Sequence, residues 1–91
     1  MSFTIVWRPI AETQLAEIWL AATDRVAVTA AANEIETALR SSPESVGESR
    51  DERTRVAVVP PIAVHFEVRD ADRLVLVLTV HSIPPSLRGR P

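Results

Sequence analysis

Short apolar runs of strand-like character occur at the start of the chain and throughout its second half. They lie at residues 3–8, 54–59, 62–68 and 74–83. In the first run every second residue is large and apolar, which is typical of a strand with one buried face. Pro60-Pro61 separates the second run from the third, and because proline cannot donate to a β-ladder, a turn is expected there. The last three runs therefore predict an antiparallel meander.

Between the first two runs the apolar residues follow the period of a helix instead. Pro9 occupies a favoured first helical position, and Asp24 offers an N-cap where the pattern is interrupted. We therefore expect one helix over residues 9–22 and a second over Arg25–Ser41. Their buried stripes are expected to comprise Ala11, Leu15, Ile18, Ala22, Val28, Ala31, Ile35, Ala38 and Leu39. The short turn between the helices predicts an antiparallel helical hairpin.

The elements thus follow the order strand, helix, helix, strand, strand, strand. This order predicts an α+β domain in which the helical hairpin packs on one face of a four-stranded, mostly antiparallel sheet. With 91 residues the chain has room for one such domain, expected over residues 1–83 and followed by a tail at residues 84–91. A domain of this size has a thin margin of stability, so a partner that covers its remaining apolar surface would stabilise it.

The composition excludes several kinds of site. Because the chain has no cysteine and only two histidines, we expect no disulfide, no metal and no cofactor. Ten arginines stand against twelve acidic residues, and the net charge of −2 argues against a protein whose main role is to wrap nucleic acid. No apolar stretch is long enough to span a membrane and no secretion signal is evident, which predicts a soluble cytoplasmic protein.

Strand side chains alternate between the two faces of a sheet, so the pattern also predicts which residues share a surface. The helices are expected to cover Val56, Val58, Ile62, Val64, Phe66, Val68, Leu74, Leu76, Leu78 and Val80. The opposite face is expected to carry Arg53, Arg55, Ala57, Ala63, His65, Glu67, Arg69, Val75, Val77, Thr79 and His81. A three-residue turn at residues 60–62 would place Arg55 opposite Glu67. Pairing residue 69 with residue 73 would set the two histidines too far apart for one metal ion.

A histidine, a carboxylate and an arginine on one sheet face form a set that could cleave RNA. Glu67 or His65 would remove the 2′-hydroxyl proton. His81 would protonate the leaving oxygen, while Arg55 or Arg53 would stabilise charge on the phosphate. The alternative is structural: Arg55 and Glu67 form a cross-strand ion pair, and the histidines are half-buried strand residues. The pattern alone leaves both interpretations open.

The order of elements and several segments resemble the RelE/ParE superfamily, the toxins of type II toxin–antitoxin modules. The resemblance is carried by residues 3–9, by Ala11, Leu15, Ile18 and Trp19, by the Ala31…Ile35…Leu39…Pro43…Gly47 run, and by residues 61–68 and 74–81. It covers nearly the whole chain and implies a small toxin that is neutralised by an antitoxin, a disordered segment of which folds as it binds. The expected contact residues on the toxin are Ala63, His65, Val75 and Val77.

The superfamily contains two mechanisms, and the residues of this chain bear on the choice between them. RelE-like members cut mRNA on the ribosome, whereas ParE-like members poison DNA gyrase. The nucleases usually carry an arginine where this chain has Ala63, and they are usually strongly basic. The resemblance therefore favours a toxin that inhibits growth by binding a target such as gyrase. The alternatives are a ribosome-dependent mRNA endonuclease that uses Arg55, His81 and Glu67, and a non-toxic binding module. A homodimer through the open sheet face is a further possible assembly.

Overall fold

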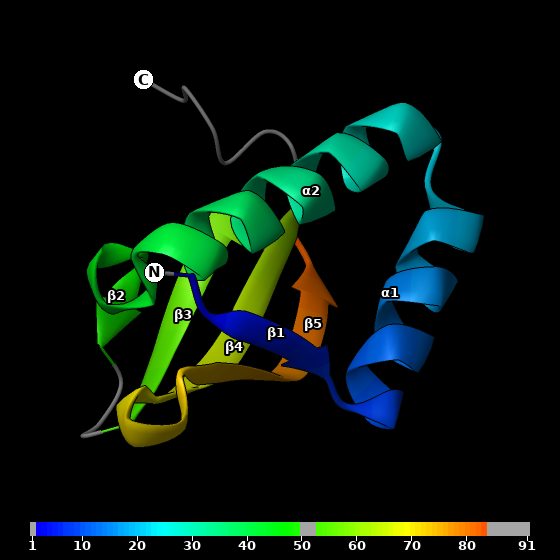
Figure 1. Ribbon diagram of the computed structural model, residues 1–91. Coiled ribbons are helices and arrows are strands. Elements are labelled where there is room, and N and C mark those ends of the chain that lie inside the picture. Colours follow the sequence, from blue (N-terminus) through cyan, green and yellow to red (C-terminus); the bar gives the residue numbers. More distant parts are fainter. Residues whose placement is uncertain (1, 50–52, 84–91) are drawn as a thin grey trace.

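The computed structural model describes residues 2–49 and 53–83 (Figure 1). The elements are β1 (Thr4–Trp7), α1 (Pro9–Ala21), α2 (Arg25–Ser41), η1 (Pro43–Ser45), β2 (Glu48–Ser49), β3 (Thr54–Val59), β4 (Ile62–Arg69), η2 (Asp70–Asp72) and β5 (Leu74–Ser82), where η denotes a 3-10 helix. Five strands form one sheet in the order β1-β5-β4-β3-β2. β1 runs parallel to β5, and the other neighbouring pairs are antiparallel.

The predicted α+β class and the predicted order of elements are confirmed, with one strand added. The extra strand, β2, lies in the segment that the sequence pattern assigns to a loop, and it pairs with β3 through Glu48 and Ser49. A strand of two polar residues has no apolar alternation, so it leaves no pattern to recognise. The sheet therefore has five strands rather than four. The expected tail at residues 84–91 lies outside the described residues.

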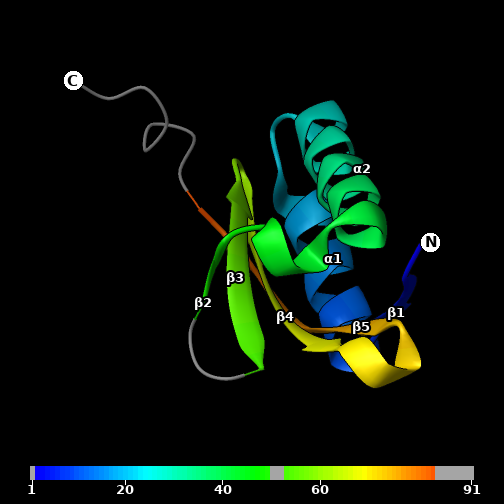
Figure 2. The same ribbon diagram turned by 60° about the vertical axis from the view of Figure 1, so that its left-hand side comes forward.

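The helices begin where the sequence places their signals. Pro9 opens α1, and Asp24 caps α2 by accepting a hydrogen bond from the backbone N–H of Ala27 at 3.0 Å. Both helices lie on the same side of the sheet and diverge from the turn that joins them (Figure 1, Figure 2). The expected hairpin is present, but it is splayed open. No helix in the part of the chain that the structure describes is long and apolar enough to cross a membrane.

The hydrophobic core lies between the helices and the sheet. Its buried side chains include Val28, Ala31, Ile35, Leu39, Ala57, Ile62, Val64, Phe66, Val75, Val77 and Val80. On α1, Ala11 is buried, while Leu15, Ile18 and the C-cap residue Ala22 are partly buried and pack against the core. The predicted stripe of α2 is thus buried except at Ala38, which is half-buried, whereas the predicted stripe of α1 is fully buried only at Ala11.

The predicted faces of β3 are wrong. The turn between β3 and β4 contains two residues rather than three, so Arg55 pairs with Phe66 instead of Glu67. A change of register by one residue moves every side chain of a strand to the other face. As a result Ala57 is buried at 2% exposure, whereas Val58 is 56% exposed.

The predicted faces of β5 are wrong for the first half of the strand. Leu78 has no partner on β4 and forms a β-bulge, which changes the alternation of side chains along the strand. Before the bulge, Val75 and Val77 are fully buried in the core. Leu74 and Leu76 lie on the face away from the helices and are half-buried. The two valines are therefore not surface residues, contrary to the expectation that they touch a partner.

Candidate functional site

The face of the sheet away from the helices carries apolar and polar side chains together. Pairing across the strands arranges them in four rows: Thr4, Leu74 and Arg69; Val6, Leu76, Glu67 and Thr54; Thr79, His65 and Val56; and His81, Ala63 and Val58. We call these rows the open face, because no helix among the described residues covers them (Figure 2). Val6 on β1 and Val58 on β3 are 40% and 56% exposed, which leaves apolar surface uncovered on both strands.

The open face brings the two histidines closer together than expected. Ala63 pairs with His81 and His65 pairs with Thr79, so the histidines occupy diagonal positions on adjacent strands. The expected pairing of residues 69 and 73 is wrong, because the turn between β4 and β5 contains one more residue than expected. Among the described residues there is nevertheless no group of three potential ligands that could hold a metal ion.

His65 has an unusual environment for a polar side chain. Its Nε2 nitrogen is buried and has no hydrogen-bond partner among the described residues. In its row it stands between Thr79 and Val56, with Ala63 and Glu67 two positions away on its own strand. A buried polar atom without a partner costs free energy.

Glu67 and His81 are too far apart to share a reaction. The carboxylate of Glu67 is bound by a neighbour on its own strand, with 3.0 Å between Oε2 and the Nε of Arg69. His81 lies opposite Ala63, four residues from Glu67, which corresponds to about 13 Å along a strand. A general base and a general acid must both reach the same phosphodiester, so this pair cannot supply them in the observed geometry.

Arg55 lies on the opposite side of the sheet from both residues. Its partner Phe66 is buried in the core, and paired residues share a face. The guanidinium donates from Nε to the carbonyl oxygen of Val46 at 2.8 Å and from a terminal nitrogen to that of Gly47 at 2.9 Å. Arg55 therefore holds the segment that follows α2 against β3. The structure does not bring together the predicted catalytic set of Arg55, Glu67 and His81.

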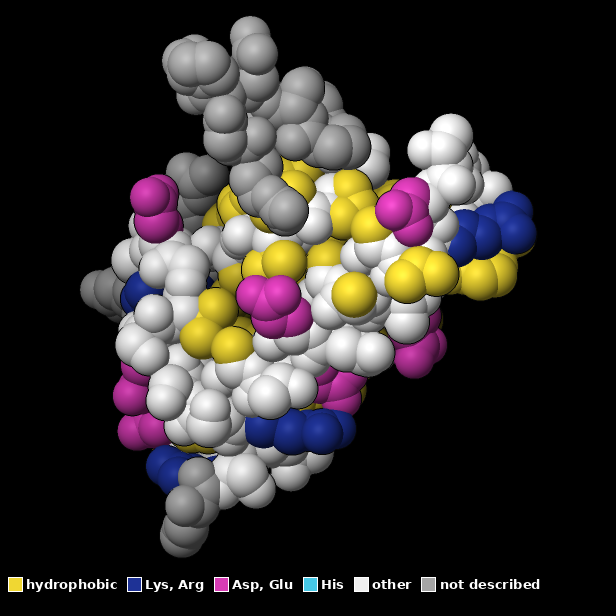
Figure 3. Space-filling model, turned by 90° about the horizontal axis from the view of Figure 1, so that it is seen from above, with side chains coloured by type: hydrophobic (Ala, Val, Ile, Leu, Met, Phe, Trp, Pro, Cys, Tyr) yellow, Lys and Arg dark blue, Asp and Glu magenta, His cyan; other side chains and the backbone are white. Residues whose placement is uncertain are grey.

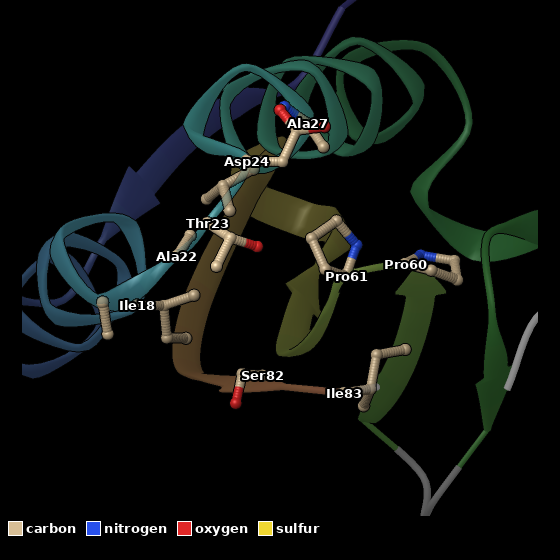
Figure 4. Close-up of a pocket in the computed structure, with 11 residues that line it drawn as sticks. Ile18, Ala22, Thr23, Asp24, Ala27, Pro60, Pro61, Ser82 and Ile83 are labelled. Atoms are coloured by element: carbon tan, nitrogen blue, oxygen red, sulfur yellow. The ribbon is translucent and has the colours of Figure 1, made fainter. Parts of the chain in front are cut away.

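Two of the hollows among the described residues lie on the helix side of the molecule. One, of about 390 Å³, lies between the α1–α2 turn and the β3–β4 turn, and its walls include Ile18, Pro61 and Ile83 (Figure 4). The other, of about 520 Å³, is a groove between α1 and α2 that is lined by both tryptophans, Trp7 and Trp19. Seen from above, this side of the molecule presents hydrophobic patches interspersed with acidic and basic side chains (Figure 3).

Comparison with known proteins identifies the fold. No protein-family model and no curated protein matches the chain. Among solved structures, a chain of the toxin–antitoxin complex RelBE2 from Mycobacterium tuberculosis superposes with a TM-score of 0.73 at 19% identity, covering 90% of this chain and 99% of that one. The ParDE system of P. aeruginosa gives a TM-score of 0.70 at 14% identity, covering 90% and 97%. A mutant of the E. coli toxin RelE in the free state gives 0.69 at 12% identity, covering 90% and 84%.

The fold is therefore that of the RelE/ParE toxin–antitoxin proteins, as the resemblance of the sequence implied. The sequence pattern correctly places Ala63, His65 and Glu67 on the open face. The pattern does not place Leu74 and Leu76 on the open face. The residues of this part of β5 are all apolar, so either alternation of side chains would put apolar residues on both faces. The pattern also does not predict the groove between the helices. The two large aromatic residues Trp7 in β1 and Trp19 in α1 are the sequence feature that could have indicated it.

Proposed function

We propose that the chain is the toxin of a type II toxin–antitoxin module and that it acts in the cytoplasm. Its fold agrees with those of toxin–antitoxin proteins over 90% of its length. The observation that carries the proposal is the open face. There a small domain exposes apolar side chains beside a buried histidine nitrogen that lacks a partner among the described residues. Such a surface suits a protein that is kept bound to a second polypeptide.

The antitoxin would cover the open face. Leu74, Leu76 and Val58 would supply the apolar contact, and the small side chain of Ala63 leaves room beside them for a bulky residue of the partner. A partner of this kind buries surface that a domain of this size cannot bury alone. A second copy of the chain is the competing occupant.

The toxin would inhibit growth by binding a target such as DNA gyrase rather than by cleaving RNA. This choice is supported by the separation of Arg55, Glu67 and His81 on two faces and over about 13 Å. It is also supported by the net charge of −2, since binding to RNA depends largely on neutralised phosphates. Ribosome-dependent mRNA cleavage and a non-toxic binding module are the alternatives.

The test is to induce the chain alone in a bacterial host and to count colony-forming units over time. A matched control is Val77→Arg, which places a charge in the core and removes the fold. Transcripts are mapped by primer extension, and the purified protein is added to a gyrase supercoiling assay. We expect loss of viability with intact transcripts and inhibited supercoiling.

Two outcomes would contradict the proposal in different ways. Transcripts cut between codons, with cutting lost in His81→Ala, would assign the endonuclease activity instead. Unchanged viability would indicate a non-toxic binding module, provided that circular dichroism shows the purified protein to be folded. Analytical ultracentrifugation of the free chain distinguishes antitoxin binding from self-association, because a monomer at micromolar concentration excludes a stable homodimer.

A further inference from the structure

The hollow between the α1–α2 turn and the β3–β4 turn lies at the point where the described part of the chain ends. Ile83, the last described residue, lines this hollow together with Ser82 (Figure 4). The backbone N–H of Ile83 donates to the carbonyl oxygen of Pro61 at 2.8 Å, which fixes Ile83 against the β3–β4 turn. Residues 84–91 therefore start from a wall of the hollow.

The walls of the hollow are mostly apolar. They are contributed by both helices and by the β3–β4 turn, and they include Ile18, Ala22, Ala27, Val28 and Pro61. Apart from Val28, these residues are only half-buried, and the hollow has a volume of about 390 Å³. Apolar surface of this kind gains stability when another apolar side chain removes it from water.

The hollow also carries a negative charge. Asp24 lines it and is exposed. The Oδ1 oxygen of Asp24 accepts the hydrogen bond from the N–H of Ala27 that caps α2. A carboxylate has two oxygens, each with more than one acceptor position, so this cap leaves Asp24 able to bind a cationic group. The hollow thus suits an occupant that is apolar and positively charged.

Residues 84–91 have this composition. Their sequence, Pro-Pro-Ser-Leu-Arg-Gly-Arg-Pro, contains one large aliphatic side chain, Leu87, and two arginines but no acidic residue. Leu87 follows Ile83 by four positions, so the two Cα atoms are at most about 14 Å apart. Because Ile83 itself lines the hollow, this length of chain is sufficient to return Leu87 to it.

We propose that residues 84–91 fold back into the hollow of their own chain. Leu87 would pack between Ile18 and Pro61, and the guanidinium of Arg88 would lie beside the carboxylate of Asp24. The segment is covalently joined to a wall of the hollow, so its effective concentration there is about millimolar. A separate polypeptide would have to compete with it.

This inference does not depend on the proposed toxicity, because the hollow lies on the helix side of the molecule and the open face lies on the other side. A docked segment would cover apolar surface that the small domain otherwise leaves to water. It would also remove this hollow from the surfaces available to a partner, while the open face would stay accessible.

The experiment is nuclear magnetic resonance of the full chain with labelled isoleucine, leucine and valine methyl groups. The signals of Leu87 are assigned by their loss in Leu87→Ala. We expect nuclear Overhauser effects between the methyl groups of Leu87 and those of Ile18 and Val28. Dilution of the labelled chain with unlabelled chain identifies the source of the segment, since only effects within one chain persist.

Two substitutions place the same charge at different positions of the segment. Leu87→Asp should abolish docking and shift the methyl signals of Ile18 and Ile83. Pro91→Asp is the matched control and should leave these signals in place. Circular dichroism of each variant verifies the fold.

The charge of Asp24 is tested separately. Asp24→Asn keeps an N-cap acceptor but removes the charge. It should lower the docking equilibrium constant, followed through the methyl shift of Ile18, by about threefold, the effect of one exposed ion pair. Glu34→Gln removes a charge from an exposed position of α2 outside the hollow and should have no effect.

Three results would overturn the inference. The first is the absence of effects between Leu87 and the hollow in the unsubstituted chain, which does not depend on any variant. The second is their disappearance on dilution, which would assign the hollow to the segment of a second copy. The third is an equal response to Leu87→Asp and Pro91→Asp. None of these results bears on toxicity, which is measured by colony counts.

Discussion

The side-chain carbonyl oxygen of Gln14 accepts a hydrogen bond from the backbone N–H of Val80 at 2.8 Å. β1 pairs with β5 only as far as Trp7 and Val77, so no strand among residues 2–49 and 53–83 neighbours the later part of β5 on that side. Gln14, from α1, satisfies a backbone donor that β1 is too short to reach. A helix thus completes the hydrogen bonding of the sheet and fixes the position of α1 against β5.

Replacing this acceptor should weaken the domain measurably. Gln14→Ala leaves a partly buried N–H without a partner, and we expect a loss of about 1–2 kcal/mol in the free energy of unfolding. Gln14→Glu keeps an acceptor oxygen and is the control, with an expected loss below about half of that value. Urea denaturation followed by circular dichroism measures both. Equal losses in the two variants would contradict the assigned role.

The corrected faces of β5 predict that neighbouring residues respond in opposite ways to truncation. Val77 is fully buried, so Val77→Ala should cost about 2 kcal/mol by removing core contacts. Leu76 is half-buried on the open face, so Leu76→Ala should cost less than about 1 kcal/mol although it removes more atoms. Thermal denaturation of the two variants measures both losses, and a larger loss for Leu76→Ala would support the faces that the sequence pattern predicts.

Gly47 should tolerate no side chain. Its φ of 71° lies in the left-handed region, and an added Cβ would stand 2.0 Å from the carbonyl oxygen of Val56. Gly47→Ala should therefore cost about 3 kcal/mol through strain and overlap with the backbone of β3. Urea denaturation measures the change. Ser45→Ala, in the same segment but without a positive φ, is the control and should cost less than about 1 kcal/mol.

Arg55 should matter for stability and not for activity. Arg55→Ala removes the two hydrogen bonds to the carbonyl oxygens of Val46 and Gly47, and we expect a loss of about 2 kcal/mol. Colony counts should be unchanged once they are normalised to the amount of folded protein. Arg55→Lys keeps the charge but cannot make both bonds, so an intermediate stability is expected. If Arg55→Ala kept full stability and lost toxicity, the result would instead indicate a catalytic role for Arg55.

The open face predicts a separation of toxicity from neutralisation. Leu76→Arg places a charge where the proposed antitoxin packs, and because the position is half-buried at the surface, the fold should survive. Co-expression with the protein encoded by the adjacent gene should then no longer rescue growth. Val26→Arg is the matched control, since Val26 is 78% exposed on α2 and lies away from this face. Full rescue of Leu76→Arg would exclude the open face as the site of neutralisation.

The sequence predicts elements better than it predicts faces. The bounds of α2 and β3 agree with the expectation because a capping aspartate and a pair of prolines mark them. The faces of β4 are also correct, since His65 and Glu67 alternate there with apolar residues. Residues 74–78 are all apolar, so nothing in that stretch distinguishes the inner side of the strand from the outer side. The position of the bulge determines which of these side chains face the core.

The candidate site was mispredicted for the same reason. A turn shorter by one residue moved Arg55 to the helix side, and a turn longer by one residue together with the bulge at Leu78 brought the two histidines to diagonal positions. Such one-residue differences depend on the local backbone conformation of the turn, which hydrophobic periodicity does not encode. The sequence therefore indicates which residue types could perform catalysis, but it does not predict how they are arranged on the sheet.

The interleaving of Val75 and Val77 with Leu74 and Leu76 has an evolutionary consequence. Residues that hold the domain together and residues available to a binding partner alternate along a single strand, one codon apart. A substitution at an outward position therefore costs less folding free energy than one at its buried neighbour. The surface of this strand can in this way change while the interior of the domain stays the same.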